Sequence, residues 1–210
     1  MKLIKIAALG LSVAVVSACA VMSTSEPTVS ADDVQAVLAS SFKEKGQAKL
    51  DRIQQTALQK SCSDAEANRS PVSGSARDQL EKAALNAIKY PSDGVWLGDW
   101  KKGESVAQTG TGLQFSDDPK NPAGGNCYAC HQLDPKELSY GNIGPSLYQY
   151  GKMRGQSEDI LRYTWGKIWN SHAYNACSNM PRFGAEGILS EAQIRDVMAL
   201  LLSPESPVNK

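Results

Sequence analysis

The stretch "GGNCYACHQ", Gly124–Gln132, decides how this chain of 210 residues is interpreted. It contains a Cys-x-x-Cys-His motif formed by Cys127, Cys130 and His131. Three kinds of site use thiols and an imidazole this close together: a covalently attached haem, a zinc site and a redox-active dithiol. Each makes different demands on the rest of the sequence, so the three can be compared.

Haem attachment uses all three side chains of the motif. Two thiols at this spacing reach the two vinyl groups of a haem, and the imidazole that follows them ligates the iron. Zinc needs four ligands, and only His172 and Cys177 are at hand to complete the set. A thioredoxin-like dithiol belongs to a βαβ setting, which this sequence does not show. The motif therefore predicts one covalent haem c, attached through Cys127 and Cys130 with His131 as the proximal iron ligand.

The N-terminus predicts export. Residues 1–20 have two early lysines, an apolar run from 6 to 16 and then small residues, which is the layout of a signal peptide. The apolar run is shorter than the roughly 20 residues of a membrane span. Cleavage after Ala20 gives a soluble protein, whereas the sequence around Cys19 also resembles a lipobox, and lipidation there would anchor the chain to a membrane. Both outcomes predict a periplasmic protein.

Net charge and cysteine content bear on the possible partners and on the role of the remaining cysteines. The formal net charge is zero, which gives no support to a nucleic-acid partner, because that would need a basic field. Outside the cytoplasm, spare thiols tend to form disulfides. If the haem takes the two cysteines of the motif, Cys62 and Cys177 remain, and we expect them to pair. The alternative is two buried thiols without partners.

Apolar periodicity predicts a mainly α fold with two parts after the leader. Residues 31–90 form a helical N-terminal extension, in which Ser75 with Asp78 resembles a capping box. Residues 95–210 contain the Cys motif and two further helices, and Ser190 opens the last of them. Between those two helices lies a long connection without periodicity, residues 170–187. Such loops are usually functional.

The sixth iron position has four candidate ligands downstream of the motif. Met198 lies on the apolar stripe of the last helix, where core packing is the expected role. Met180 lies in the long connection, and a thioether ligand raises the reduction potential of a haem iron. We expect Met180 to be the distal ligand, with His172 and Met153 as alternatives and simple gap filling as the other role for Met180. An iron held by His and Met leaves no open position for a substrate, so it transfers electrons.

Further segments resemble known proteins. "NIGPSL", residues 142–147, is similar to a Gly-Pro-x-Leu segment of class I cytochromes c, which implies that the carbonyl of Pro145 accepts a hydrogen bond from the proximal histidine. Together, "GDWKKGESVAQTG", "GGNCYACHQL", "GNIGPSL", "YGKMRG", "MPRFG" and "ILSEAQIRDVMALLLSPESPVNK" resemble the SoxX subunit family of SoxAX cytochromes over about residues 95–210. The expected fold is therefore a class I cytochrome c-like helical domain with an N-terminal helical extension.

The resemblance implies a role in periplasmic sulfur oxidation. In that family, a SoxX subunit forms a heterodimer with a SoxA-type cytochrome, and the complex is an L-cysteine S-thiosulfotransferase. It joins thiosulfate oxidatively to a cysteine of a SoxYZ-type carrier protein, and the SoxX haem passes the electrons to a downstream cytochrome c. For this chain the resemblance implies haem attachment at Cys127 and Cys130, proximal His131 and distal Met180, with bond making on the partner. The alternative is a free-standing periplasmic cytochrome c that shuttles electrons.

Overall fold

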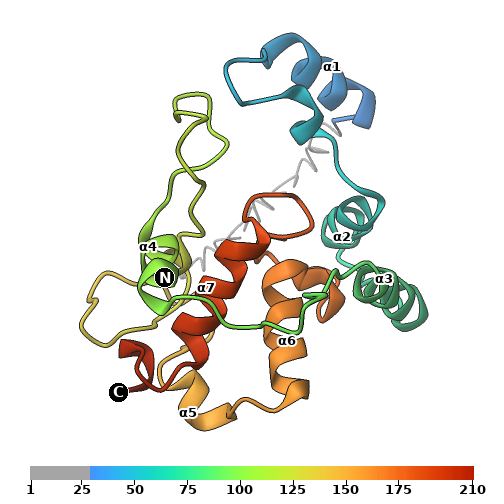
Figure 1. The fold of residues 1–210 in the computed structure, drawn as a ribbon. Coiled ribbons are helices and arrows are strands. Elements are labelled where there is room, and N and C mark those ends of the chain that lie inside the picture. The colour runs from blue at the N-terminus through green and yellow to red at the C-terminus, as the bar shows by residue number, and fades with distance from the viewer. Residues whose placement is uncertain (1–28) are drawn as a thin grey trace, which may run out of the picture. The chain divides into compact units, whose positions relative to one another are not determined.

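The structure is a computed structural model, and it describes residues 29–210 (Figure 1). The predicted signal peptide over residues 1–20 and the lipobox cysteine Cys19 lie outside the described residues. Within residues 29–210, no helix has both the length and the apolar character needed to cross a bilayer.

Helices form the regular structure of the described residues, which confirms the mainly α prediction. No strand is present between residues 29 and 210, where the only β pairing is an isolated bridge from Lys45 to Ala48. The α-helices are α1 (Ala31–Ser41), α2 (Ala57–Ala67), α3 (Gly74–Asn86), α4 (Trp100–Gln108), α5 (Tyr150–Arg154), α6 (Glu158–Trp169) and α7 (Glu191–Leu202). Short 3-10 helices are η1 (Leu50–Ile53), η2 (Cys127–Ala129), η3 (Ser171–Ala173) and η4 (Pro207–Asn209).

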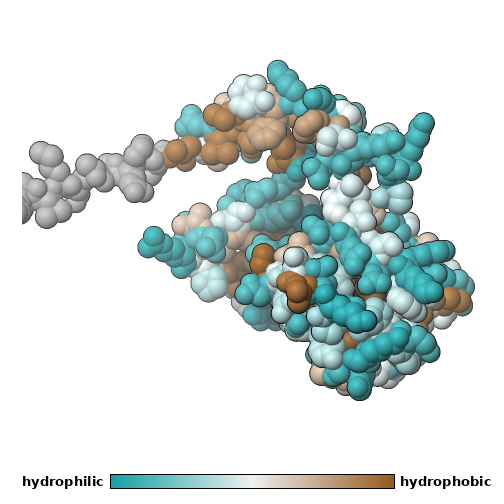
Figure 2. Space-filling view, turned by 90° about the vertical axis from the view of Figure 1, so that its left-hand side faces the viewer, coloured by the Kyte–Doolittle hydropathy of each residue, from teal (hydrophilic) through white to brown (hydrophobic). Residues whose placement is uncertain are grey.

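By packing, the chain divides after Ser41 into two compact units. The first contains α1, which has no buried residue and leaves Val34 and Val37 exposed, and Figure 2 shows apolar surface on this unit. The second begins at Phe42 and contains every other helix. The segment 31–90 is therefore divided in the structure, because α2 and α3 belong to the unit that contains the Cys motif.

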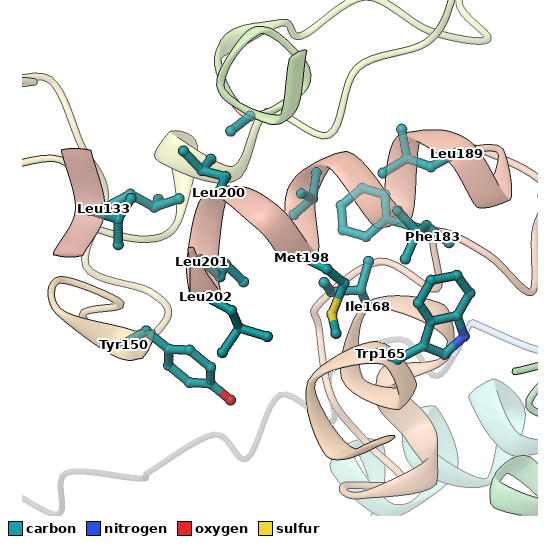
Figure 3. Packing of buried hydrophobic residues seen from close by; sticks show 14 of the residues in the cluster. Leu133, Tyr150, Trp165, Ile168, Phe183, Leu189, Met198, Leu200, Leu201 and Leu202 are labelled. Atoms are coloured by element: carbon teal, nitrogen blue, oxygen red, sulfur yellow. The ribbon is translucent and has the colours of Figure 1, made fainter. Parts of the chain in front are cut away.

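Helix α7 forms the centre of the core, and its buried residues are Ile194, Val197, Met198, Ala199, Leu200, Leu201 and Leu202. Helix α4 lies beside it in Figure 1 and touches it at Gly103. A Cβ added to Gly103 would lie 2.1 Å from the carbonyl oxygen of Asp196 and 3.0 Å from the Cβ of Leu200, so only glycine allows this contact. Figure 3 shows Met198 with Trp165 and Ile168 of α6 on another side of α7.

Local capping determines where several helices begin. At α7, the Ser190 hydroxyl accepts a hydrogen bond from the Gln193 amide and the Gln193 side chain accepts one from the Ser190 amide, a capping box. The sequence predicted such a helix start at Ser75 as well, and that prediction was wrong. The hydroxyl of Ser73 reaches the amide of Ala76 instead, so α3 begins at Gly74.

The C-terminal tail folds back onto the core. Val208 is fully buried, and its carbonyl accepts a hydrogen bond of 2.7 Å from the amide of Gln149. The side-chain amide of Asn209 donates to the carbonyls of Leu201 at 3.0 Å and Ser203 at 2.9 Å. These bonds satisfy two of the carbonyls that the end of α7 leaves without partners. The tail therefore joins the end of α7 to the segment that leads into α5.

Candidate haem-binding site

The Cys motif is placed by a loop that leaves the end of α4 and returns to it. The amide of Gly125 donates to the carbonyl of Val106 at 2.8 Å, and the amide of Asn126 donates to the carbonyl of Thr109 at 2.9 Å. Asn126 adopts the left-handed conformation, with φ at 45°, which Asn tolerates better than most residues. The next residue is Cys127, so the motif begins directly beside the last turn of α4.

The motif itself forms one tight turn. The carbonyl of Cys127 accepts hydrogen bonds from the amides of Cys130 at 3.1 Å and His131 at 2.9 Å. Between them, Tyr128 is buried, and its hydroxyl accepts a hydrogen bond of 3.2 Å from the amide of Asp134. Both thiols and the imidazole therefore extend from a single turn whose buried tyrosine fixes it to the protein.

The imidazole of His131 has a defined orientation. Its Nδ1 lies 2.7 Å from the carbonyl oxygen of Pro145, the contact that the class I resemblance implies. Because a carbonyl can only accept, Nδ1 carries the proton and donates it, which leaves the lone pair of Nε2 free for a metal. The ring also lies against Gly144, where an added Cβ would be 2.2 Å from Cε1 and 2.7 Å from Nε2.

The side chain of Cys127 is partly buried and packs against the hydrophobic core. A Cβ added to Gly125 would lie 3.1 Å from the sulfur of Cys127 and 3.7 Å from methyl carbons of both Leu189 and Val106. Burial raises the pKa of Cys127 to about 12. Redox-active dithiols depend on a lowered thiol pKa, so this environment disfavours the dithiol alternative. Apolar walls, two unpaired thiols and an imidazole with a free Nε2 together fit a covalent haem.

The structure also bears on the zinc alternative. Across residues 29–210, no three Cys, His, Asp or Glu side chains gather into a group that could hold a metal ion. His172 and Cys177, the residues that could have completed a zinc set, have other partners. Nε2 of His172 lies 3.2 Å from the carbonyl oxygen of Ser178, and Cys177 is bonded to Cys62.

Met180 is held by its backbone in the connection between α6 and α7. The hydroxyl of Ser171 donates to its carbonyl at 2.6 Å, and its amide donates to the hydroxyl of Ser178 at 3.2 Å. Its side chain is partly buried and packs against the hydrophobic core. Met180 also lines a cleft of about 400 Å³, which it shares with His172.

The other candidate ligands lie in different surroundings. Met153 is 67% exposed on α5, whereas Met198 is fully buried within α7 in the packing role expected for it. His172 is buried, and this burial is the main cause that lowers its pKa. The positive charge of Arg182 is the second cause. The structure thus separates Met153 and Met198 from the cleft that contains Met180 and His172.

Cys62 and Cys177 form a disulfide in the structure, with their Cα atoms 5.6 Å apart. This is the pairing expected from the cysteine count of an exported chain. The bond joins α2 to the connection that carries Met180, three residues before that methionine.

Sequence reasoning missed several residues that hold these side chains in place. Gly144 was not predicted to contact the ring of His131, although its missing side chain makes room for that ring. The serines that hold the backbone of Met180 were missed as well, because Ser171 lies nine residues away and no motif links the two. The glycine had a usable signal, its position directly before Pro145. The serines had none.

Comparison with known proteins gives a family match over part of the chain. Residues 120–204 match the cytochrome c family model, and this range includes the Cys motif, Pro145, Met180 and the whole of α7. A cytochrome c domain is therefore present. It supports a haem-containing electron-transfer protein and implies a covalently bound haem c.

One curated relative adds detail. An uncharacterized lipoprotein of Aquifex aeolicus (strain VF5) is 43% identical over 133 residues. The aligned region covers 63% of this chain and 63% of the relative, so the chain spans less than two thirds of the relative's length.

Proposed function

We propose that this protein is the electron-accepting monohaem subunit of a periplasmic SoxAX-type complex. In this proposal, a SoxA-type partner and a SoxYZ-type carrier protein carry out the bond making, as in an L-cysteine S-thiosulfotransferase. The haem of this chain accepts the electrons and passes them to a downstream cytochrome c. The observation that carries the proposal is the ordered set of SoxX-like segments between residues 95 and 210.

Those segments coincide with contacts that define the site and its support. The first contains Gly103, where α4 touches α7, and the last contains the whole of α7 and the tail that returns to it. The segment "GNIGPSL" supplies both Gly144 and Pro145, which contact the ring of His131. The resemblance therefore involves residues that determine the geometry of the domain, as well as the widespread Cys motif.

Each residue of the site has a separate task in this proposal. Cys127 and Cys130 would hold the haem through thioether bonds, and His131 and Met180 would be its iron ligands. The bound haem supplies one-electron transfer. The carbonyl of Pro145 keeps the proton on Nδ1 of His131, so that Nε2 stays available to the iron.

The overall reaction sets the electron count. Joining thiosulfate to a carrier thiol forms one sulfur–sulfur bond and releases two electrons and one proton. A single haem takes one electron at a time, so this subunit must be reoxidised by the downstream cytochrome between two transfers.

We also propose that the protein is exported, with Cys19 deciding whether it is attached to a membrane. The Aquifex aeolicus relative is named a lipoprotein, and this name favours the lipobox alternative for the present chain. Mass spectrometry of the mature N-terminus tests this point. A diacylglyceryl group on Cys19 would establish the anchor, and a free N-terminus after Ala20 would establish the soluble form.

Reconstitution tests the subunit assignment. The haem-loaded protein is mixed with a SoxA-type partner and a SoxYZ-type carrier, thiosulfate is added, and reduction of this haem is followed by its absorbance. We expect reduction only when both proteins are present, and none when the reactive cysteine of the carrier is replaced by serine. Reduction at the same rate without the partner would instead favour a free-standing electron shuttle.

A further inference from the structure

Helices α2 and α3 make direct attachments to the connection that carries Met180. Cys62 of α2 forms the disulfide with Cys177, and Glu81 of α3 accepts a hydrogen bond of 3.0 Å from the amide of Ala176. Two neighbouring residues of the connection are therefore fixed to two helices that come more than 90 positions earlier in the chain.

The fixed residues lead directly to the methionine. Ser178 follows Cys177, and its carbonyl oxygen lies 3.2 Å from Nε2 of the buried His172. The hydroxyl of Ser178 accepts a hydrogen bond from the amide of Met180. The carbonyl of Met180 in turn accepts a hydrogen bond from the hydroxyl of Ser171. An unbroken series of contacts thus runs from the disulfide to both backbone groups of Met180.

Helix α2 also forms a wall of the cleft in which Met180 lies. Its residues Leu58, Gln59 and Cys62 line that cleft together with Met180 and Pro181. Met180 therefore borders a space that α2 also bounds. A movement of α2 away from the connection would open that space.

We propose that α2 and the Cys62–Cys177 disulfide are a positioning element that holds Met180 on the haem iron. This inference rests on the proposed function in one respect, that Met180 is the distal ligand. The disulfide does not touch the iron. It acts through the connection, by limiting how often the loop moves far enough to release the thioether.

The expected effect follows from competition at the sixth position. An external ligand such as imidazole binds the ferric iron only when Met180 has left it, so its apparent dissociation constant is the intrinsic constant divided by the open fraction. In the variant Cys62→Ser/Cys177→Ser, we expect the open fraction to rise and imidazole to bind about tenfold more tightly. The weak far-red absorption of the ferric protein, which reports the sulfur–iron bond, should decrease in parallel.

Variants of Glu81 provide a graded comparison. Glu81→Gln keeps a side-chain oxygen that can accept the amide of Ala176, and it should bind imidazole like the wild type. Glu81→Ala removes this acceptor and should shift imidazole affinity in the same direction as the double serine variant, by a smaller factor.

General loosening of the fold is tested by Val208→Ala, which creates a cavity in the buried tail, where η4 packs on α5 and α7. If this variant loses as much thermal stability as the double serine variant and gains the same imidazole affinity, the positioning role is refuted. If the double serine variant fails to accumulate, haem-loaded wild type is treated with a phosphine reductant and N-ethylmaleimide, reoxidised with ferricyanide and measured in the same way.

The outcomes separate the two proposals. Wild-type far-red absorption together with unchanged imidazole affinity after loss of the disulfide would overturn the positioning role and leave Met180 as the ligand. A wild-type ferric protein without the far-red absorption would instead remove Met180 as the ligand, and the positioning role with it.

Discussion

The contact between His131 and Gly144 allows a sharp test of the proximal site, because one added methyl group probes it. A Cβ at position 144 would lie 2.2, 2.5 and 2.7 Å from Cε1, Nδ1 and Nε2 of the ring. Atoms in ordinary van der Waals contact are about 3.5–4.0 Å apart, so Gly144→Ala forces the ring and the backbone to separate by roughly an ångström or more.

Two costs follow from this separation. Overpacking of this kind typically destabilises a protein by about 1–3 kcal/mol. The displaced ring also loses its hydrogen bond to Pro145, which contributes about 1 kcal/mol. We therefore expect Gly144→Ala to lower the free energy of unfolding of the haem-loaded protein by about 2–4 kcal/mol. Loss of the same hydrogen bond makes His131 a less basic ligand, which should raise the reduction potential.

The assay is guanidinium unfolding of the haem-loaded protein, with the reduction potential measured by redox titration. Gly74→Ala is the matched control, because a Cβ at this first residue of α3 would meet no atom within 4 Å. Alanine is also the better helix former, so the control should be as stable as the wild type or slightly more stable. If Gly144→Ala matched Gly74→Ala in both measurements, the ring of His131 would not lie against Gly144.

Three further predictions concern other parts of the site and the fold. Met180→Leu should keep the covalent haem but lose the far-red ferric absorption and lower the reduction potential in a redox titration, because a thioether favours ferrous iron. Ser190→Ala should cost about 1 kcal/mol in urea unfolding, whereas Ser157→Ala should cost almost nothing because its hydroxyl makes no capping bond; equal losses would contradict the capping role. Burial holds the pKa of His172 below its ordinary value of 6.5, so the unfolded chain binds more protons and stability should fall as pH decreases below about 6.5. In urea unfolding at several pH values, His172→Gln should make the free energy of unfolding depend less on pH. An unchanged pH dependence would show that other groups cause it.

The helical class and the start of α7 were predictable because their signals are local. Apolar periodicity and a serine followed three residues later by glutamine are visible within a single helix, and the structure contains that capping box at Ser190. The same kind of signal misled at Ser75, where two serines two positions apart compete and Ser73 forms the cap. A pattern of residue types cannot decide between such neighbours, because the choice depends on the path by which the chain enters the helix.

Periodicity also gave no information about what covers an apolar face. Val34 and Val37 recur at helical spacing and form α1, yet α1 has no buried residue in its unit. By contrast, Gly103 lies in a helix whose contact with α7 depends on a residue more than 90 positions later. The sequence shows that a helix is amphipathic, but the partner of its apolar face is decided by tertiary packing.

The two sides of the haem site differ for the same reason. On the proximal side, the Cys motif, Gly144 and Pro145 lie within residues 127–145, so one resemblance sufficed to connect His131 with its hydrogen-bond acceptor. On the distal side, the surroundings of Met180 are assembled from residues as far apart in the sequence as Leu58 and Pro181, and no local pattern links them. Sequence reasoning therefore left His172 and Met153 open as alternatives. Long-range attachments that fix a loop can be changed without altering the ligands themselves, so the distal side is where we expect variants remote from the iron to shift its ligation.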